Sequence, residues 1–179
     1  MGRDKALIEI NGITLAARTA DLLRAVVAFA LEVGPGRSSL ASIREEPAGE
    51  GPLAAIVAGR RALLERGLPA TAACIVVACD LPMLSAGVLR RLAEAPGEQS
   101  VLPIIDAVAQ PLCARWSASD LDAAAVAFKS GERSLRRHPD RESATLLDEA
   151  TWGSGASEFR DADTPEDLAA LGVWPNSRA

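Results

Sequence analysis

The stretch Ala73-Cys-Ile-Val-Val-Ala-Cys-Asp-Leu-Pro-Met-Leu84 decides the fold. It begins as a continuous apolar run, stops at the charged residue Asp80, and cannot continue as a sheet ladder at Pro82, which has no N–H to donate. A short apolar run bounded by turn signals predicts a strand buried on both faces. Such strands are typical of parallel sheets covered by helices, so the stretch predicts an α/β fold.

The rest of the chain alternates between strand-like and helix-like segments. The apolar spacing predicts a helix over 14–25, Gly51-Pro52-Leu53 opens a second over 51–65, and Ser85 caps a third that ends near residue 94. The remaining expected elements are strands at 26–33, 101–105, 109–116 and 158–162, helices at 117–129, 146–147 and from 164 onward, and a polar loop over 38–50. This alternation predicts a mostly parallel sheet of Rossmann-like type.

Length and charge limit the classes of function. The chain has 179 residues, is 49% hydrophobic and carries a formal net charge of −5. These values predict one folded domain over 1–172, with a loose tail over 173–179. The acidic balance gives no basic footprint for nucleic acid or an anionic membrane. No signal peptide or long apolar span is visible, so we expect a cytoplasmic protein, either a monomer or a weak homo-oligomer.

Two further groups of residues were considered as possible binding sites. The three cysteines and the single histidine have no metal-ligand spacing, which argues against a zinc site. The basic cluster Arg133, Arg136, Arg137 and Arg141 is either a solvated surface or a binding patch for a substrate phosphate.

The residues that follow the predicted strands indicate a catalytic site at one edge of the sheet. Ligands of open α/β sheets bind at the carboxyl ends of strands, where Asp80 and Asp163 are expected. Two carboxylates with phosphate oxygens and water suit Mg²⁺, and Lys5 would add a charge for the same phosphates. This set fits transfer of a nucleotidyl group. In the alternative interpretation Asp80 and Asp163 only assist helix caps or turns, and Lys5 is a solvated lysine.

Six segments together resemble one known family. They are Met1-Gly-Arg-Asp-Lys-Ala-Leu7, Glu50-Gly-Pro-Leu-Ala-Ala-Ile56, Ala78-Cys-Asp-Leu-Pro-Met-Leu84, Gln110-Pro-Leu-Cys-Ala114, Gly131-Glu-Arg-Ser-Leu135 and Phe159-Arg-Asp-Ala-Asp-Thr-Pro-Glu-Asp-Leu168. In this order they resemble landmarks of the molybdenum cofactor guanylyltransferases, whose fold is of the nucleotide-diphospho-sugar transferase type.

The resemblance implies an enzyme that uses Mg²⁺ and GTP. GMP would pass to molybdopterin, usually carrying molybdenum, giving the guanine dinucleotide and pyrophosphate. By position, Lys5 would contact the GTP phosphates and Asp80 would bind Mg²⁺ and nucleotide, with Asp163 as a second metal contact. Glu45, or the adjacent Glu46 as a nearly equal fit, would help hold the guanine, and the loop Gly51-Pro52-Leu53 would line its pocket.

The chain also departs from the family pattern. The family begins with a strand and a glycine-rich loop ahead of the Met-Gly pair, and residues 1–179 contain neither. We therefore expect the true start to lie upstream of Met1. Gln110 stands where His is expected, Ala55 where Gly is expected, and the last segment has Asp where Asn is frequent. These changes leave open a CTP-dependent or other-acceptor nucleotidyltransferase, or a catalytically impaired nucleotide-binding module.

Overall fold

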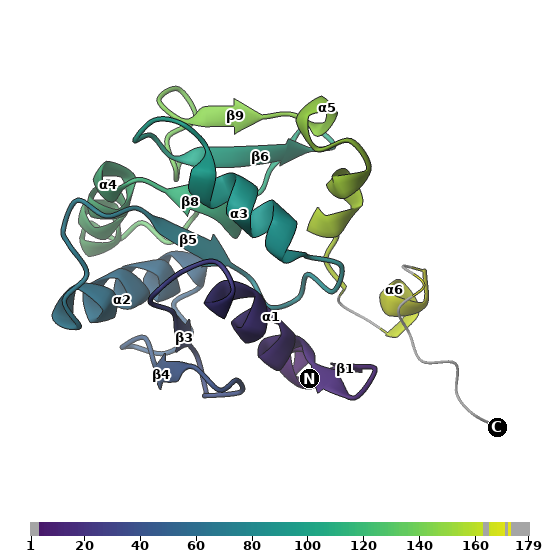
Figure 1. The fold of residues 1–179 in the computed structure, drawn as a ribbon. Coiled ribbons are helices and arrows are strands. Elements are labelled where there is room, and N and C mark those ends of the chain that lie inside the picture. Colours follow the sequence, from purple (N-terminus) through teal and green to yellow (C-terminus); the bar gives the residue numbers. More distant parts are fainter. Residues whose placement is uncertain (1–3, 163–164, 171, 173–179) are drawn as a thin grey trace.

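The computed structural model describes residues 4–162, 165–170 and 172, shown as a ribbon in Figure 1. The strands are β1 (Glu9–Ile10), β2 (Ile13–Thr14), β3 (Leu31–Val33), β4 (Ala41–Ile43), β5 (Cys74–Val77), β6 (Val101–Ile105), β7 (Val108–Ala109), β8 (Cys113–Trp116) and β9 (Thr145–Leu147). The helices are α1 (Leu15–Arg24), α2 (Pro52–Glu65), α3 (Ala86–Glu94), α4 (Ala118–Lys129), α5 (Glu149–Trp152) and α6 (Pro165–Ala170), with 3-10 helices η1 (Lys5–Leu7) and η2 (Gly153–Phe159).

The central sheet contains five strands of mixed direction. Four of the strands follow the order β5–β8–β6–β7. The fifth strand, β9, also pairs with β6. Strands β5, β6 and β9 run one way, whereas β8 lies antiparallel between β5 and β6. The connection from β6 to β8 is too short for a parallel crossover, which needs a dozen or more residues. The expected α/β fold is confirmed, with this reversed strand inside it.

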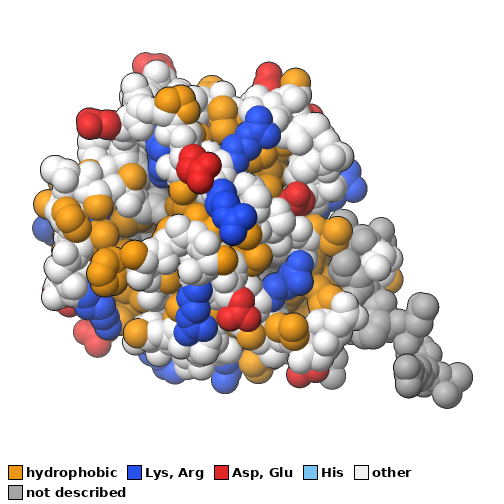
Figure 2. Space-filling view, in the orientation of Figure 1, with side chains coloured by type: hydrophobic (Ala, Val, Ile, Leu, Met, Phe, Trp, Pro, Cys, Tyr) orange, Lys and Arg blue, Asp and Glu red, His pale blue; other side chains and the backbone are white. Residues whose placement is uncertain are grey.

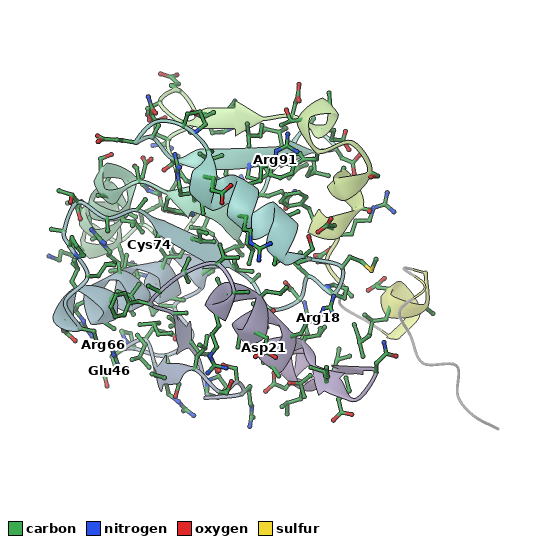
Figure 3. All side chains as sticks on the ribbon, viewed as in Figure 1. Arg18, Asp21, Glu46, Arg66, Cys74 and Arg91 are labelled. Atoms are coloured by element: carbon green, nitrogen blue, oxygen red, sulfur yellow. The ribbon has the colours of Figure 1, made fainter. Side chains whose placement is uncertain are left out.

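Helices cover both faces of the sheet. On one face Ile75 and Val77 of β5 pack into the cluster that contains α3. On the other face Cys74 and Val76 pack into a cluster with Trp116, next to α2 and α4. In Figure 1, α1 and α3 lie in front of the strands. The labelled side chains of these two helices are visible on that side in Figure 3, where Arg91 of α3 lies over the Trp152 ring, 5.1 Å from its centroid. The alternation along β5 thus produces a three-layer arrangement.

Local signals placed the helix starts correctly. The Thr14 hydroxyl accepts a hydrogen bond from the Ala17 N–H (3.1 Å), and the Ser85 hydroxyl accepts one from Val88 (3.4 Å). Gly51 precedes α2 with φ +90°, a conformation that favours glycine, and Pro52 is the first helical residue. α2 and α3 therefore begin where Gly51-Pro52 and the Ser85 cap predict, and α1 begins within one residue of its predicted start.

Several sequence-based assignments were wrong in detail. The predicted helix at 146–147 is β9, which pairs in parallel with β6 through Val101 and Thr145. The predicted strand at 158–162 is absent, because the 3-10 helix η2 continues to Phe159. The strand predicted over 26–33 forms only from Leu31, and the loop 38–50 contains the unpredicted strand β4. These segments are too short for hydrophobic periodicity to decide, so tertiary pairing decides instead.

The carboxyl-terminal part packs against the amino-terminal part. Leu168 and Ala162 share a buried cluster with Ile10 and Leu15. Residues 173–179, predicted to be a loose tail, lie outside the described residues. In the part of the chain that is described, no helix has both the length and the apolar character needed to cross a membrane.

Candidate active site at the carboxyl edge of the sheet

Two predicted site residues that lie far apart in the sequence meet in the structure. Lys5 stands on η1, and Asp80 lies in the turn just after β5. The Lys5 Nζ is 3.7 Å from the Asp80 Oδ2, and the two side chains are 41% and 26% exposed. The pair is therefore accessible to a ligand at the carboxyl edge of the sheet, where α/β proteins bind their substrates.

The turn that carries Asp80 is anchored on both sides. Leu81 and Pro82 are buried, and the Asp80 carbonyl accepts a hydrogen bond from the Ala162 N–H at 2.9 Å. The cap of the following helix α3 is Ser85, so capping that helix is not the role of Asp80. The backbone thus holds this carboxylate at the edge independently of helix capping.

Residues that the sequence analysis missed complete this edge. Glu32 on β3 accepts hydrogen bonds from the N–H groups of Gly36 (2.7 Å) and Ser38 (2.8 Å), and also from Arg37. Arg37 in turn donates its Nε–H to Asp4 Oδ2 at 2.9 Å, beside Lys5. The loop 34–38 is therefore wrapped around the Glu32 carboxylate, and it brings a guanidinium next to η1.

A sequence signal for this loop existed. Gly34-Pro-Gly-Arg37 follows the predicted strand directly, at the edge where ligands bind, yet we interpreted it only as the end of that strand. Gly36 has φ +77°, which favours glycine and lets the chain turn back onto Glu32.

The Glu32 contacts make the loop sensitive to acid. Partial burial alone would raise the pKa of Glu32, but hydrogen bonds from Arg37, Ser38 and Gly36 outweigh it and lower the pKa below its ordinary value of 4.5. The stabilisation is therefore complete above the unfolded-state pKa and is lost as the pH falls through the lowered folded-state pKa. We expect Glu32→Gln to cost about 1 kcal/mol at neutral pH and to flatten the acid limb of stability. Urea unfolding of both proteins from acid to neutral pH measures this, and parallel curves would contradict it.

The cysteines near the site are not nucleophiles. Burial, followed by the negative charges of Asp80, Asp4 and Glu32, raises the pKa of the Cys79 thiol. Burial likewise raises the pKa of Cys74, and that of Cys113 to about 12. Because thiols with raised pKa values stay protonated at neutral pH, none of these three cysteines is activated as a thiolate.

A cavity of about 590 Å³ opens beside the Lys5–Asp80 pair. Pro52 of the predicted loop lines it together with Lys5 and Asp80, whereas Leu53 is fully buried in the core beside Trp116. Gly51 forms the bend that delivers Pro52. Glu45 does not line the cavity; its Oε1 accepts a hydrogen bond from the Gly49 N–H at 3.1 Å. The structure therefore gathers Lys5, Asp80 and Pro52, and it leaves Glu45 in the neighbouring loop.

The edge suits a metal that is shared with phosphate oxygens. Among the described residues, no three His, Cys, Asp or Glu side chains are grouped as a metal site. Asp163 lies outside the described residues, although Ala162, its neighbour in sequence, is hydrogen-bonded to Asp80. Mg²⁺ commonly takes one or two protein carboxylates and completes its shell with substrate phosphates and water. The accessible Asp80 carboxylate fits that pattern.

The basic cluster separates into two parts. Arg133 forms an ion pair with Glu50, and its guanidinium lies 4.2 Å from the centroid of the Phe128 ring. Arg136 and Arg141, with His138, line a second cavity of about 440 Å³ beside Pro111. On the face shown in Figure 2, basic side chains are interspersed with acidic and apolar ones. Arg136 and Arg141 therefore meet at one cavity, whereas Arg133 is engaged by Glu50 and the Phe128 ring.

Comparisons with known proteins identify the family of the chain. Residues 1–144 match the family model described as the MobA-like NTP transferase domain. The chain is 29% identical to the molybdenum cofactor guanylyltransferase of Xanthomonas euvesicatoria pv. vesicatoria, over 96% of this chain and 87% of the relative. It is 33% identical to a probable molybdenum cofactor guanylyltransferase of Opitutus terrae, over 76% of this chain and 70% of that protein.

A solved structure shows the same fold. The molybdopterin-guanine dinucleotide biosynthesis protein A of Archaeoglobus fulgidus superposes with a TM-score of 0.68 at 22% identity, covering 94% of this chain and 89% of that one. The family match spans most of the chain and includes both Lys5 and Asp80. The chain belongs to the MobA-like NTP transferase domain family of nucleotidyltransferases.

Proposed function

We propose that this protein transfers GMP from GTP to molybdopterin, forming the guanine dinucleotide cofactor and pyrophosphate. The observation that carries the proposal is the accessible Lys5–Asp80 pair, 3.7 Å apart at the carboxyl edge of the sheet. The proposal is supported by two similar proteins. One is a molybdenum cofactor guanylyltransferase and the other is a probable molybdenum cofactor guanylyltransferase.

The reaction needs no covalent intermediate. An oxygen of the molybdopterin phosphate attacks the α-phosphorus of GTP, the bond from that phosphorus to the bridging oxygen breaks, and pyrophosphate leaves with the electron pair. A phosphate monoester is already largely ionised at neutral pH, so its attack needs little help from a general base. What the protein must supply is positioning and stabilisation of negative charge.

The side chains at this edge divide these tasks. In this proposal Lys5 contacts the GTP phosphates, and Asp80 holds Mg²⁺ against them, with Asp163 as a second metal contact. The metal, when bound, neutralises charge on the α-phosphate and on the departing pyrophosphate. Pro52 at the cavity wall, with Gly51 before it, is assigned to the guanine side of the nucleotide, whereas the buried Leu53 and Glu45 in the neighbouring loop are not.

Lys5 offers a direct test because the chain has only two lysines, Lys5 and Lys129. Lys129 is exposed at the end of α4, so it is a matched internal control. We expect GTP with Mg²⁺ to slow the reaction of Lys5 with an amine acylating reagent about tenfold and to leave Lys129 unchanged, because the triphosphate covers the Lys5 Nζ. Mass spectrometry of peptides measures both rates. Equal labelling with and without nucleotide would contradict the assignment.

Turnover measurements test which nucleotide is the donor and whether molybdopterin is the acceptor. Pyrophosphate release is measured with each of GTP, CTP, ATP and UTP, with molybdopterin present or omitted. The proposal requires release with GTP that depends on molybdopterin. Faster release with CTP would instead assign the chain to cytidylyl transfer, and release with none of them would favour a binding module.

We assign the second cavity to the anionic acceptor. It lies beside Pro111, while the adjacent Leu112 lines the nucleotide cavity, so the two cavities adjoin along one sheet edge. We expect replacement of both Arg136 and Arg141 by Ala to raise the KM for molybdopterin at least about tenfold and to leave GTP binding unchanged, since each arginine contributes about 1 kcal/mol to phosphate binding. The exposed pair Arg61 and Arg66 at the carboxyl end of α2 gives a matched double-alanine control. An unchanged KM would contradict the assignment.

A further inference from the structure

The second cavity has two walls of different chemistry. The hairpin lip, which is residues 106–109 at the tip of the β6–β7 hairpin, lines the cavity with the side chains of two alanines and a valine. The segment 135–141 lines it with Arg136, His138 and Arg141. A ligand of this cavity therefore meets apolar side chains from the hairpin and nitrogen-bearing side chains from the segment.

The turn of the hairpin lip adopts a conformation that its sequence does not favour. Ile105 pairs with Val108, so the loop between the strands has two residues, Asp106 with φ +49° and Ala107 with φ +61°. Such loops are usually built from Asn-Gly or Asp-Gly, because glycine has no Cβ to oppose a left-handed backbone. Among the described residues with positive φ, Ala107 is the one that is neither glycine, asparagine nor aspartate. The Ala107 methyl group is thus present at a cost in stability.

The sheet behind the lip holds this strained turn in place. The Gln110 N–H donates to the Pro103 carbonyl at 2.9 Å, and the Gln110 Nε2 donates to the Val108 carbonyl at 3.3 Å. The Nε1–H of the buried Trp116 donates to the Pro111 carbonyl at 2.9 Å. Val108 is nevertheless 59% exposed where it lines the cavity. The lip is therefore a rigid apolar surface that a ligand can reach.

We propose that the hairpin lip binds the ring system of the acceptor, separately from the arginines that bind its phosphate. This inference rests on the proposed function, which assigns the second cavity to molybdopterin. The fused ring of a pterin is flat, and small apolar side chains on a rigid surface can cover such a ring closely. Ala107 and Val108 are the specificity-determining residues of this contact, because both are exposed at the cavity.

Binding of a phosphate alone does not account for the lip. An anion needs hydrogen-bond donors or cations, and the side chains of residues 107–109 provide neither. The adjacent Asp106 is exposed and carries a negative charge, which repels an anion from this end of the cavity. The charges therefore place the phosphate at Arg136 and Arg141 and leave the lip to the uncharged ring.

Two fragments of the acceptor separate the two walls experimentally. Inorganic phosphate carries the anion without the ring, and hydroxymethylpterin carries the ring without the anion. His138 is the only histidine of the chain and lines the cavity, so the NMR signals of its imidazole report binding of either fragment. Titration of each fragment without nucleotide gives both dissociation constants.

Replacements in the two walls are expected to give opposite patterns. Ala107→Gly combined with Val108→Ser should weaken binding of the pterin at least about fivefold and that of phosphate less than about twofold, because only apolar contacts are lost. Arg136→Ala combined with Arg141→Ala should weaken phosphate binding at least about tenfold and pterin binding less than about twofold. In turnover, the lip variant should raise the KM for molybdopterin at least about fivefold with kcat unchanged, because the ring contact is the same in the ground and transition states.

Ala107→Gly alone changes stability and binding in opposite directions. Glycine relieves the left-handed backbone and should raise the urea midpoint of unfolding, while loss of the methyl group weakens pterin binding. A turn with a purely structural role would gain stability without losing affinity. Asn11, with φ +53° in the β1–β2 turn, lines neither cavity, so Asn11→Gly is the matched control and should leave pterin binding unchanged.

The outcomes for the lip and for the transfer reaction are separate. Equal pterin binding by the lip variant and the unchanged protein would overturn the inference and leave nucleotidyl transfer standing. Unchanged His138 signals up to the solubility limit of the pterin would overturn it as well. Pyrophosphate release from GTP that does not depend on molybdopterin would overturn the proposed function, whereas the fragment titrations would still decide whether the lip binds a pterin ring.

Discussion

Asp80→Ala is expected to abolish magnesium-dependent GTP binding and to lower kcat/KM for pyrophosphate release by about 100-fold to 1000-fold. The reason is that Asp80 is the described carboxylate that meets Lys5 at the mouth of the cavity. Without it the metal loses its assigned ligand among the described residues, and the charge of the α-phosphate and pyrophosphate is poorly neutralised. Titration of GTP binding at several Mg²⁺ concentrations, followed by turnover, measures both effects.

Two controls separate the charge of Asp80 from its structural role. Asp80→Asn keeps the shape of the side chain and removes the charge, so we expect it to fail in metal binding while unfolding like the unchanged protein. Asp122 is an exposed carboxylate on α4, and Asp122→Ala should change neither property. If GTP binding to Asp80→Ala keeps its dependence on Mg²⁺, the assigned metal contact is wrong and a different site performs the chemistry.

Arg115→Met is expected to destabilise the fold by about 3 kcal/mol. Arg115 is a buried residue of β8 whose guanidinium donates to four backbone carbonyls at the end of α3 and in the segment from there to β6: Ala93 (3.3 Å), Ala95 (2.6 Å), Gly97 (2.9 Å) and Gln99 (2.9 Å). Burial lowers the pKa of Arg115, yet an arginine stays charged at neutral pH. Methionine fills much of the same volume but leaves these carbonyls without their donor. Urea unfolding measures the loss.

The matched variants for Arg115 test the geometry of its contacts. Arg115→Lys keeps the charge but not the planar fork, so it should recover only part of the lost stability. Arg61 is 70% exposed on α2 and pairs with Glu65 at 3.7 Å, and Arg61→Met should change stability by less than about 0.5 kcal/mol. A loss below about 1 kcal/mol for Arg115→Met would show that water replaces the guanidinium at these carbonyls.

The sequence by itself determined the features that depend on neighbouring residues. Caps, bends and helical spacing are local, so Gly51 and Ser85 marked the starts of α2 and α3 correctly, and the apolar spacing after Thr14 predicted α1. An apolar run that ends in a carboxylate placed Asp80 directly after a strand, and β5 ends just ahead of it, although its residues are half-buried rather than buried. The assignment of Asp80 to an α/β sheet edge therefore followed from hydrophobic patterning and turn chemistry alone.

Only the tertiary structure decided the features that depend on distant pairing. The 3.7 Å contact of Lys5 with Asp80, the wrapping of loop 34–38 around Glu32 and the pairing of β9 with β6 all join segments whose sequences do not report their partners. Side-chain and backbone pairing across the chain overrides local preference when a segment has only a few residues. The half-burial of β5 shows the same limit, because its apolar residues predict full burial but the elements that pack against them decide how much is reached.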